Sequence, residues 1–357
     1  MQIFTYERLR TFLEQIFLKL GCSDLHAVKA TDVLLKADLR GIDSHGIARM
    51  SSYVRLWEIG RINSTPDIHI VHETPSTGVI DGDSGLGLVI APEAMALAIQ
   101  KADQVGTGWV AVRNSNHYGI AGYHAMQALE HDMIGMTMTN ASPMVAPTFS
   151  RERMLGTNPI AVAFPAGQEP PFVADFASTT ASYGKVEILQ RKKAPVPLGW
   201  IQDSQGEPSQ DSNGITEGGA MLPLGSDREH GSHKGYCLGA MVDIFSAVLS
   251  GANYGPWVPP YVSFLKTTNE SVGNGIGHFF GAFRIDAFRP ADEFKDHMDR
   301  WIQRFRKAHP TKEYPEVLIP GDPERENETL RMAEGIPVVD PVVKDLQRLA
   351  KKFSIAF

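Results

Sequence analysis

The chain has 357 residues, 43% hydrophobic and 21% charged, enough to bury the core of one large or two intertwined domains. Its net charge of −7 argues against general nucleic-acid binding, and no apolar run is long enough to predict a membrane span. Two cysteines are too few for a disulfide framework, and no signal-peptide pattern opens the chain. We therefore expect a cytoplasmic location.

The first sixty residues are predicted to be helical. Two amphipathic helices end at Gly21 and Gly41, with Ser23 as the expected N-cap of the second. A third helix is expected from residue 44 to near Gly60.

From residue 77 the pattern changes to alternating strands and helices. Two successive strand–helix–strand units predict parallel pairing with right-handed crossovers. The strands of these units are expected at 77–82, 108–114 and 134–140, and their helices at 92–106 and 119–132.

The second half adds further strands and helices. Strands are expected at 158–166, 171–177 and 277–286, and helices at 179–193, 232–251, 290–308, from 323 and from 341. The helix at 232–251 is apolar on nearly every side, which predicts a buried position. The polar, glycine-rich segment 202–219 is expected to be a surface excursion.

A nucleotide, if one binds, is not held in the usual Rossmann manner. Gly85 and Gly87 are followed by Ile90 where a third glycine would complete the dinucleotide fingerprint, and no Walker A motif occurs.

Two predicted helix starts could instead hold an anion. One carries Ser178, Thr179 and Thr180, and the other carries His233 and Lys234. The alternative is that the serines at these positions, Ser178 and Ser232, simply cap helices.

The stretch "LRGIDSHGIARM" holds the first polar cluster. On a helix, His45, Arg49 and Tyr53 would share one face, which combines an acid/base group with a guanidinium suited to a carboxylate. Ser44 could orient the imidazole. The alternative is an exposed polar helix face that pairs with carboxylates.

Two further clusters follow strands. His117 lies in a predicted strand-to-helix loop, where α/β proteins build their sites, although turn chemistry explains its polar neighbours equally well. Thr157 lies in "LGTNPI", which alone indicates only a turn. His117, His124 and His131 recur every seven residues without a zinc motif, so we expect no metal site and place His124 and His131 on a helix surface.

Six motifs occur in the order seen in the malate/L-lactate dehydrogenase family, the non-Rossmann group of NAD(P)-dependent oxidoreductases. They are "RGIDSHGIAR", "NSNHYGIAGYHA", "LGTNPIAVAFPA", "VADFASTTASYGKV", "HKGYCLGAMVDIFSAVLSG" and "LIPGDPE". The chain resembles this family over roughly residues 4–351. The resemblance implies a homodimer with an α/β fold and active sites near the subunit interface. It also implies a helical unit of residues 1–72 with 305–357, beside a mixed-sheet core of residues 73–304 that carries cofactor-binding and dimerisation elements.

The resemblance also implies roles for particular residues. Ser44 and His45 match the family's serine–histidine pair, His117 a histidine that some relatives use as proton acceptor, and Arg49 the substrate-carboxylate arginine; with Arg49 we place Tyr53 and Thr157 in the substrate site. The residues matched to cofactor-binding positions are Asp175, Phe176, Ala177, His233, Lys234, Gly321 and Asp322.

The sequence therefore predicts an NAD(P)-dependent oxidoreductase that transfers a hydride between nicotinamide and a small 2-hydroxy or 2-oxo acid, such as malate or L-lactate. Arg49 would bind the carboxylate, and either His45 or His117 would move the hydroxyl proton. The preference between NAD and NADP stays open. The alternatives are an imino-acid reductase on the same scaffold, a hydrolase and a non-catalytic anion-binding module.

Overall fold

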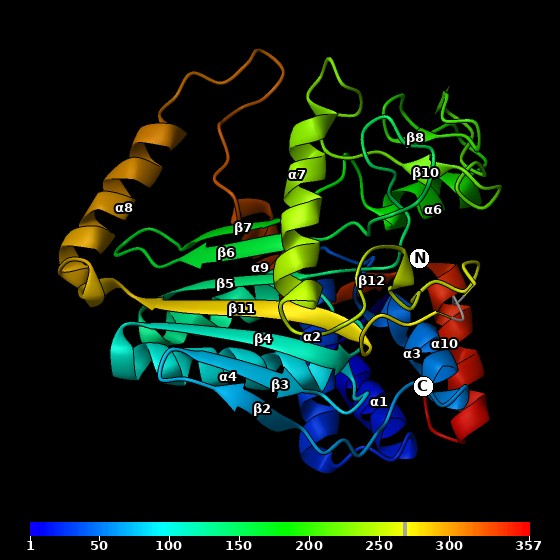
Figure 1. Cartoon of the computed structure of the whole chain (residues 1–357), viewed down its shortest axis with the longest axis horizontal. Coiled ribbons are helices and arrows are strands. Elements are labelled where there is room, and N and C mark those ends of the chain that lie inside the picture. Colours follow the sequence, from blue (N-terminus) through cyan, green and yellow to red (C-terminus); the bar gives the residue numbers. More distant parts are fainter. Residues whose placement is uncertain (267–269) are drawn as a thin grey trace.

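The structure is a computed structural model that describes residues 1–266 and 270–357. Its centre is a seven-stranded mixed sheet with the order β2-β3-β4-β11-β5-β6-β7 (Figure 1). The strands are β2 His69–Glu73, β3 Thr77–Asp81, β4 Thr107–Ser115, β11 Ile276–Arg284, β5 Met133–Thr139, β6 Ile160–Phe164 and β7 Phe172–Phe176. Strands β3 and β4 pair in parallel, and the other neighbours pair antiparallel.

The first predicted strand–helix–strand unit is confirmed by the parallel pairing of β3 with β4. The prediction for the second unit is wrong, because β11 lies between β4 and β5 and pairs antiparallel with both. Strand β11 is apolar and buried along seven of its nine residues, which suits a central position covered on both faces.

Helices cover both faces of the sheet. On one face lie α4 (Gly87–Val105) and α5 (Ala121–Met126), which pack against Phe280 and its neighbours. On the other face, α7 (Ser232–Asp243) packs against Phe279 (Figure 1). Phe279 and Phe280 face opposite sides of the sheet because successive side chains of a strand alternate between its two faces.

The helix predicted at 232–251 is present, but its burial is not. Helix α7 continues into a π-helical turn, Ile244–Val248, and only one side of this rod packs on the sheet. The other side exposes large apolar side chains: Met241, Ile244, Phe245, Val248 and Leu249. Apolar residues on every side of this helix therefore do not mean that the single chain buries it. They mark a helix face that the single chain leaves uncovered.

The two ends of the chain form one helical layer. It contains α1 Tyr6–Lys19, α2 Asp24–Leu39, α3 Met50–Glu58, α9 Asp322–Glu334 and α10 Asp340–Phe353, with β1 Gln2–Phe4 paired to β12 Ile336–Val338. The C-terminal Phe357 packs its ring against Phe4 and Phe12. Ser23 accepts a hydrogen bond from the His26 amide, as an N-cap does. These contacts support, as a proposal, one unit of residues 1–72 and 305–357.

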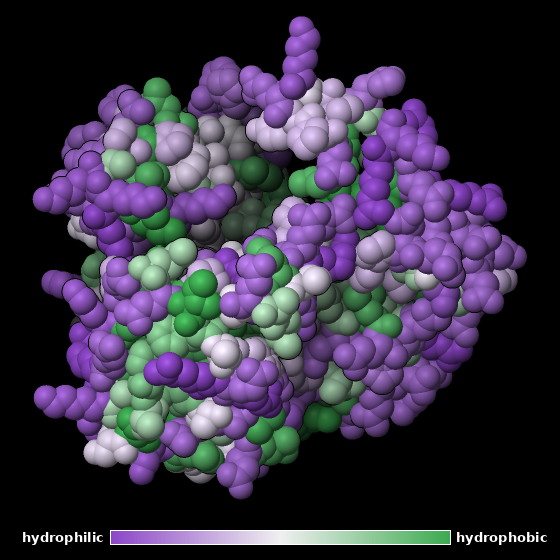
Figure 2. Space-filling view, turned by 180° about the vertical axis from the view of Figure 1, so that it is seen from behind, coloured by the Kyte–Doolittle hydropathy of each residue, from purple (hydrophilic) through white to green (hydrophobic). Residues whose placement is uncertain are grey.

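A smaller lobe stands above one end of the sheet. It consists of α6 Tyr183–Arg191 and a three-stranded sheet of β8 Ile201–Gln202, β9 Pro208–Ser209 and β10 Ala220–Met221. Seen from behind, the molecule is hollowed between this lobe and the body (Figure 2). Helix α8, Ala291–Arg306, lies at the opposite side of the molecule. In the described parts of the chain, no helix is both long and apolar enough to cross a bilayer.

Candidate active site

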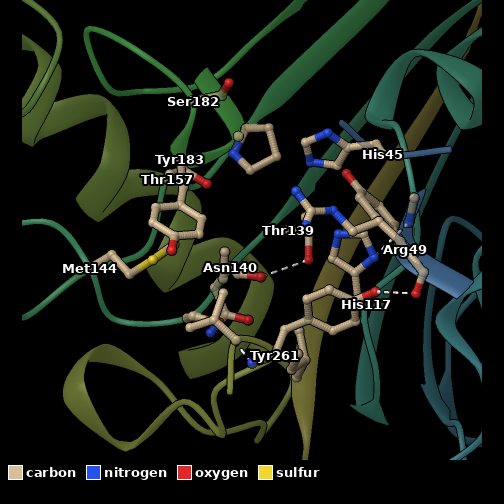
Figure 3. A pocket seen from close by; sticks show the side chains of 18 residues that line it. His45, Arg49, His117, Thr139, Asn140, Met144, Thr157, Ser182, Tyr183 and Tyr261 are labelled. Atoms are coloured by element: carbon tan, nitrogen blue, oxygen red, sulfur yellow. Dashed lines mark hydrogen bonds between the residues drawn. The ribbon is translucent and has the colours of Figure 1, made fainter. Parts of the chain in front are cut away.

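A cavity of about 100 Å³ lies where the helical layer, the sheet and the smaller lobe meet. Four of the predicted site residues line it: His45, Arg49, His117 and Thr157. Figure 3 shows the two histidines and Arg49 on one side of the cavity, with Thr157 and Tyr183 across from them. At about 30 Å³ per water molecule, this volume holds roughly three waters, which is the scale of a small organic acid rather than a dinucleotide.

The segment that carries His45 is not the helix predicted from residue 44. The chain turns after α2, passes through a 3₁₀ turn at Ile47–Arg49, and starts α3 only at Met50. The buried carboxylate of Asp38 accepts a hydrogen bond of 2.7 Å from the Ile47 amide and so fixes the turn. A Cβ at Gly46 would lie 2.2 Å from that carboxylate, so this close approach requires glycine.

His45 is held by its neighbour in the sequence. Its Nδ1 lies 2.9 Å from the Ser44 hydroxyl, which can donate or accept in this pair. Burial, and then the charge of Arg49, lower the pKa of His45 to about 4. The imidazole is therefore neutral at neutral pH.

His117 is enclosed by aromatic side chains. Its ring stacks against His45, with 5.6 Å between ring centres, and against Tyr261, with 4.4 Å between ring centres. Burial, followed by the neighbouring His45 ring and the charge of Arg49, lowers the pKa of His117 well below its usual value.

The hydrogen bonds of His117 fix its tautomer. The Gly119 amide donates to Nδ1, and the Tyr53 hydroxyl lies 2.7 Å from the same atom. A backbone N–H can only donate, so Nδ1 carries a lone pair and the ring proton sits on Nε2. Tyr53 is fully buried behind His117 and does not line the cavity, so its contact is with the histidine.

Arg49 supplies the permanent positive charge of the cavity wall. Its Nε donates to the Ser44 carbonyl, and one terminal nitrogen lies 3.5 Å from the Glu187 carboxylate of α6. Its side chain is 16% exposed, which leaves part of the guanidinium open to a small anion.

Sequence reasoning missed several lining residues. Tyr261 lines the cavity and directly follows Pro259 and Pro260 in the sequence. Arg61 holds this loop by donating hydrogen bonds to the carbonyls of both prolines. Asn140 and Ser142 follow β5, so their position after a buried strand was an available signal. Tyr261 had no such signal, because only tertiary packing brings it to His117.

A second groove, of about 420 Å³, lies at the end of β7 beside the start of α9. It is lined by Asp175, Phe176 and Gly321, three of the residues predicted to bind a cofactor. Asp175 accepts a hydrogen bond of 2.7 Å from the Gly122 amide. Ala177 follows directly but does not line the groove.

Asp322 acts inside the protein rather than in the groove. Its carboxylate accepts from the Ile319 amide and pairs with Arg306 and Arg325. These contacts fix the loop that presents Gly321.

The first of the two anion sites predicted at helix starts differs from expectation. Helix α6 begins at Tyr183, so Ser178, Thr179 and Thr180 precede it, and their hydroxyls donate to backbone carbonyls. The expected helix N-terminus at these three residues is therefore wrong.

His233 and Lys234 do lie in the first turn of α7. The His233 ring contacts Arg228, Lys234 is exposed, and neither residue lines the groove at β7. Within one chain, these two residues thus stand apart from the other predicted cofactor residues.

Two more histidines are buried near the cavity. The expected surface position of His124 is wrong, because it is fully buried and its Nε2 bonds to the Tyr118 carbonyl. His278 of β11 lies between Thr139 and Ser115, bonded to both hydroxyls. Burial lowers the pKa of His124 to about 4 and that of His278 to about 3. Among residues 1–266 and 270–357, no three metal-binding side chains converge.

Comparison with known proteins finds relatives that match nearly the whole chain. A malate dehydrogenase of Pyrococcus abyssi is 42% identical over 98% of this chain and 94% of that relative. An L-sulfolactate dehydrogenase of Methanocaldococcus jannaschii is 37% identical over 98% of this chain and 96% of that relative. The solved structure of malate dehydrogenase from Pyrococcus horikoshii superposes with a TM-score of 0.89 at 38% identity, covering 99% and 96% of the two chains.

These matches run along the whole length of the chain rather than through one motif. Residues 4–347 match the malate/L-lactate dehydrogenase family. The mixed-sheet fold is what the resemblance in the sequence implied. The chain belongs to the malate/L-lactate dehydrogenase family and is a hydroxy acid dehydrogenase that works with a nicotinamide cofactor.

Proposed function

We propose that the enzyme interconverts a small 2-hydroxy acid, such as malate or L-lactate, and its 2-oxo partner in the cavity at His45, Arg49 and His117. The observation that carries this proposal is the placement of one open guanidinium beside two neutral histidines in a small cavity. Arg49 binds the C1 carboxylate through its planar N–H groups. Thr157, on the opposite wall, contacts the rest of the substrate.

The hydrogen bonds suggest different roles for the two histidines. When Nδ1 of His45 donates to the Ser44 hydroxyl, Nε2 has a free lone pair and can take the substrate's hydroxyl proton. His117 holds its proton on Nε2 because two donors approach its Nδ1. His117 therefore stabilises the substrate oxygen by donating a hydrogen bond, and His45 is the general base.

The groove at β7 fits part of a nicotinamide dinucleotide. Phe176 offers a 41% exposed aromatic ring against which a ring of the cofactor can stack. The short segment that follows Phe176 joins this groove to the cavity, because Ser178 bonds twice to the Thr157 carbonyl. The cofactor, NAD or NADP, accepts or supplies the hydride when it is bound.

We further propose that two copies associate through the apolar surface that α7 and its π-helical turn leave exposed beside the sheet. An apolar groove of about 730 Å³ lies there, formed by Trp109, Met138 and Phe279 of the sheet and by Phe245 and Leu249 beside them. A monomer rarely leaves so continuous an apolar surface in water. A Leu249→Asp variant should run as a monomer in size-exclusion chromatography if this face joins the subunits. The exposed and unpaired Cys237 suits a reducing compartment such as the cytoplasm.

The test of the catalytic proposal is a substrate panel. Pyruvate, oxaloacetate and sulfopyruvate are each supplied with NADH and with NADPH, and the loss of reduced-cofactor absorbance is followed. We expect turnover of at least one of these 2-oxo acids. A matched assay with a cyclic imino acid addresses the imino-acid reductase alternative, which the malate dehydrogenase relatives make the weaker candidate.

Arg49→Lys tests the carboxylate contact. Lysine keeps the charge but loses the two parallel N–H groups, so catalytic efficiency should fall by about 10²-fold or more. Unchanged kinetics in this variant would remove Arg49 from the substrate site.

A further inference from the structure

Helix α6 is pressed against the segment that carries Arg49. A Cβ at Gly184 would lie 2.8 Å from the Ser44 Cβ and 3.6 Å from a terminal nitrogen of Arg49. The preceding residues, Ser182 and Tyr183, line the cavity. A long side chain one turn after Gly184, on the same face of α6, can therefore reach the Arg49 guanidinium.

Glu187 is that side chain, and its carboxylate stands between two arginines. One oxygen lies 3.5 Å from a terminal nitrogen of Arg49, and the other accepts a hydrogen bond of 2.8 Å from Arg191. Glu187 is 26% exposed and Arg191 is 53% exposed, so the pair lies at the outer edge of the cavity. The contact with Arg191 is the shorter one.

We propose that Glu187 competes with the substrate carboxylate for Arg49 and thereby sets the affinity of the enzyme for its acid. This inference rests on the proposed role of Arg49 as the substrate-carboxylate arginine. The protein's own carboxylate occupies one terminal nitrogen of the guanidinium, the same kind of group that an incoming 2-oxo acid brings. When substrate binds, Glu187 keeps its bond to Arg191 and gives up the longer contact to Arg49.

Competition between Glu187 and the substrate carboxylate for Arg49 predicts the sign of a change in the Michaelis constant. Removing the charge of Glu187 removes both a rival for Arg49 and a negative charge near an anionic substrate. Partly exposed ion pairs are weak, so the Michaelis constant for a 2-oxo acid should fall by about two- to fivefold. Turnover should stay within about twofold, because Glu187 does not line the cavity where the proton moves.

Glu187→Gln is the main variant, assayed with pyruvate and oxaloacetate. Glu187→Asp is the second, because its shorter side chain keeps the charge but should not reach Arg49, and it should also lower the Michaelis constant. Arg191→Gln is the matched control with the opposite sign. It leaves Glu187 with Arg49 as its remaining partner, so the Michaelis constant should rise.

An uncharged substrate analogue separates competition from a merely structural effect. Pyruvamide has no carboxylate, so Glu187→Gln should leave its kinetics unchanged. A Michaelis constant for pyruvate that stays the same or rises in both Glu187 variants would overturn the inference, as would an equal change with pyruvamide. If Arg49→Lys also left pyruvate kinetics unchanged, the carboxylate contact itself would fail. A loss confined to Arg49→Lys would refute the role of Glu187 alone.

Discussion

The proton step at His45 should determine the pH dependence of catalysis. Burial and the charge of Arg49 lower the pKa of His45 from 6.5 to about 4. Charging this imidazole before substrate binds therefore costs about 3 kcal/mol more than in water. Oxidation of the hydroxy acid needs the neutral form, so kcat/KM should stay level from about pH 8 to pH 5 and fall only as the pH approaches 4.

Substrate should move that ionisation. The bound carboxylate neutralises Arg49, the second cause of the low pKa, so the pKa of His45 rises in the complex. The fall in kcat should thus occur at a higher pH than the fall in kcat/KM. Initial rates with malate or lactate, over about pH 4 to 8, measure both profiles, and an assay at pH 7 after incubation at each pH shows whether the enzyme survived.

Two variants identify the residue that titrates. His45→Asn should lose about 10²- to 10⁴-fold in turnover together with the acidic fall, whereas His117→Asn should keep the fall and mainly raise the Michaelis constant. An ionisation near neutrality in the parent kcat/KM profile would refute the reasoning from burial. The acidic fall lost only in His117→Asn would make His117 the base.

Three further predictions concern stability. Gly46→Ala would place a methyl group 2.2 Å from the Asp38 carboxylate, so the free energy of unfolding should fall by about 1–3 kcal/mol, and an unchanged urea midpoint would contradict the close packing. Tyr53→Phe removes a hydrogen-bonding partner of buried His117 and should cost about 1–3 kcal/mol in the same assay; a parental midpoint would show that the hydroxyl is dispensable. Four histidines at and beside the cavity, His45, His117, His124 and His278, have lowered pKa values. Their contribution to the free energy of unfolding is present above pH 6.5 and is lost as the pH falls toward 4, by up to about 1.4 kcal/mol per pH unit for each; equal urea midpoints at about pH 7 and 5.5 would count against this.

Sequence patterns predicted those parts of the fold that depend on interactions between residues close together in the chain. The apolar stripe of α1, the serine cap of α2 and the parallel pair β3–β4 follow from periodicity, capping and a short crossover. The position of β11 does not, because its pairing partners lie far away in the sequence. The expectation that α7 is buried failed for a related reason: hydrophobicity reports that a face must be covered, but not whether the same chain covers it.

The candidate site shows the same contrast between residues close together in the sequence and residues brought together by the fold. His45 and Arg49 were grouped by helical spacing, and they do lie together, although a 3₁₀ turn anchored by Asp38 replaces the helix. His117 was found because it follows a strand, whereas Tyr261 and Glu187 approach from other elements and left no sign at their own positions. Only the fold shows which distant side chain completes a local cluster.

The central position of β11 has a consequence for biosynthesis. His278 pairs across the sheet with Thr139, which leaves the ribosome 139 residues earlier. Until β11 is made, β4 and β5 each lack a neighbour and present open backbone edges, the kind of surface on which strands of other chains can add. Closing so long a loop is slow, because its entropy must be lost before the contacts form. A nascent chain that stops short of residue 284 therefore carries two unfinished half-sheets, which makes it a natural client for chaperones.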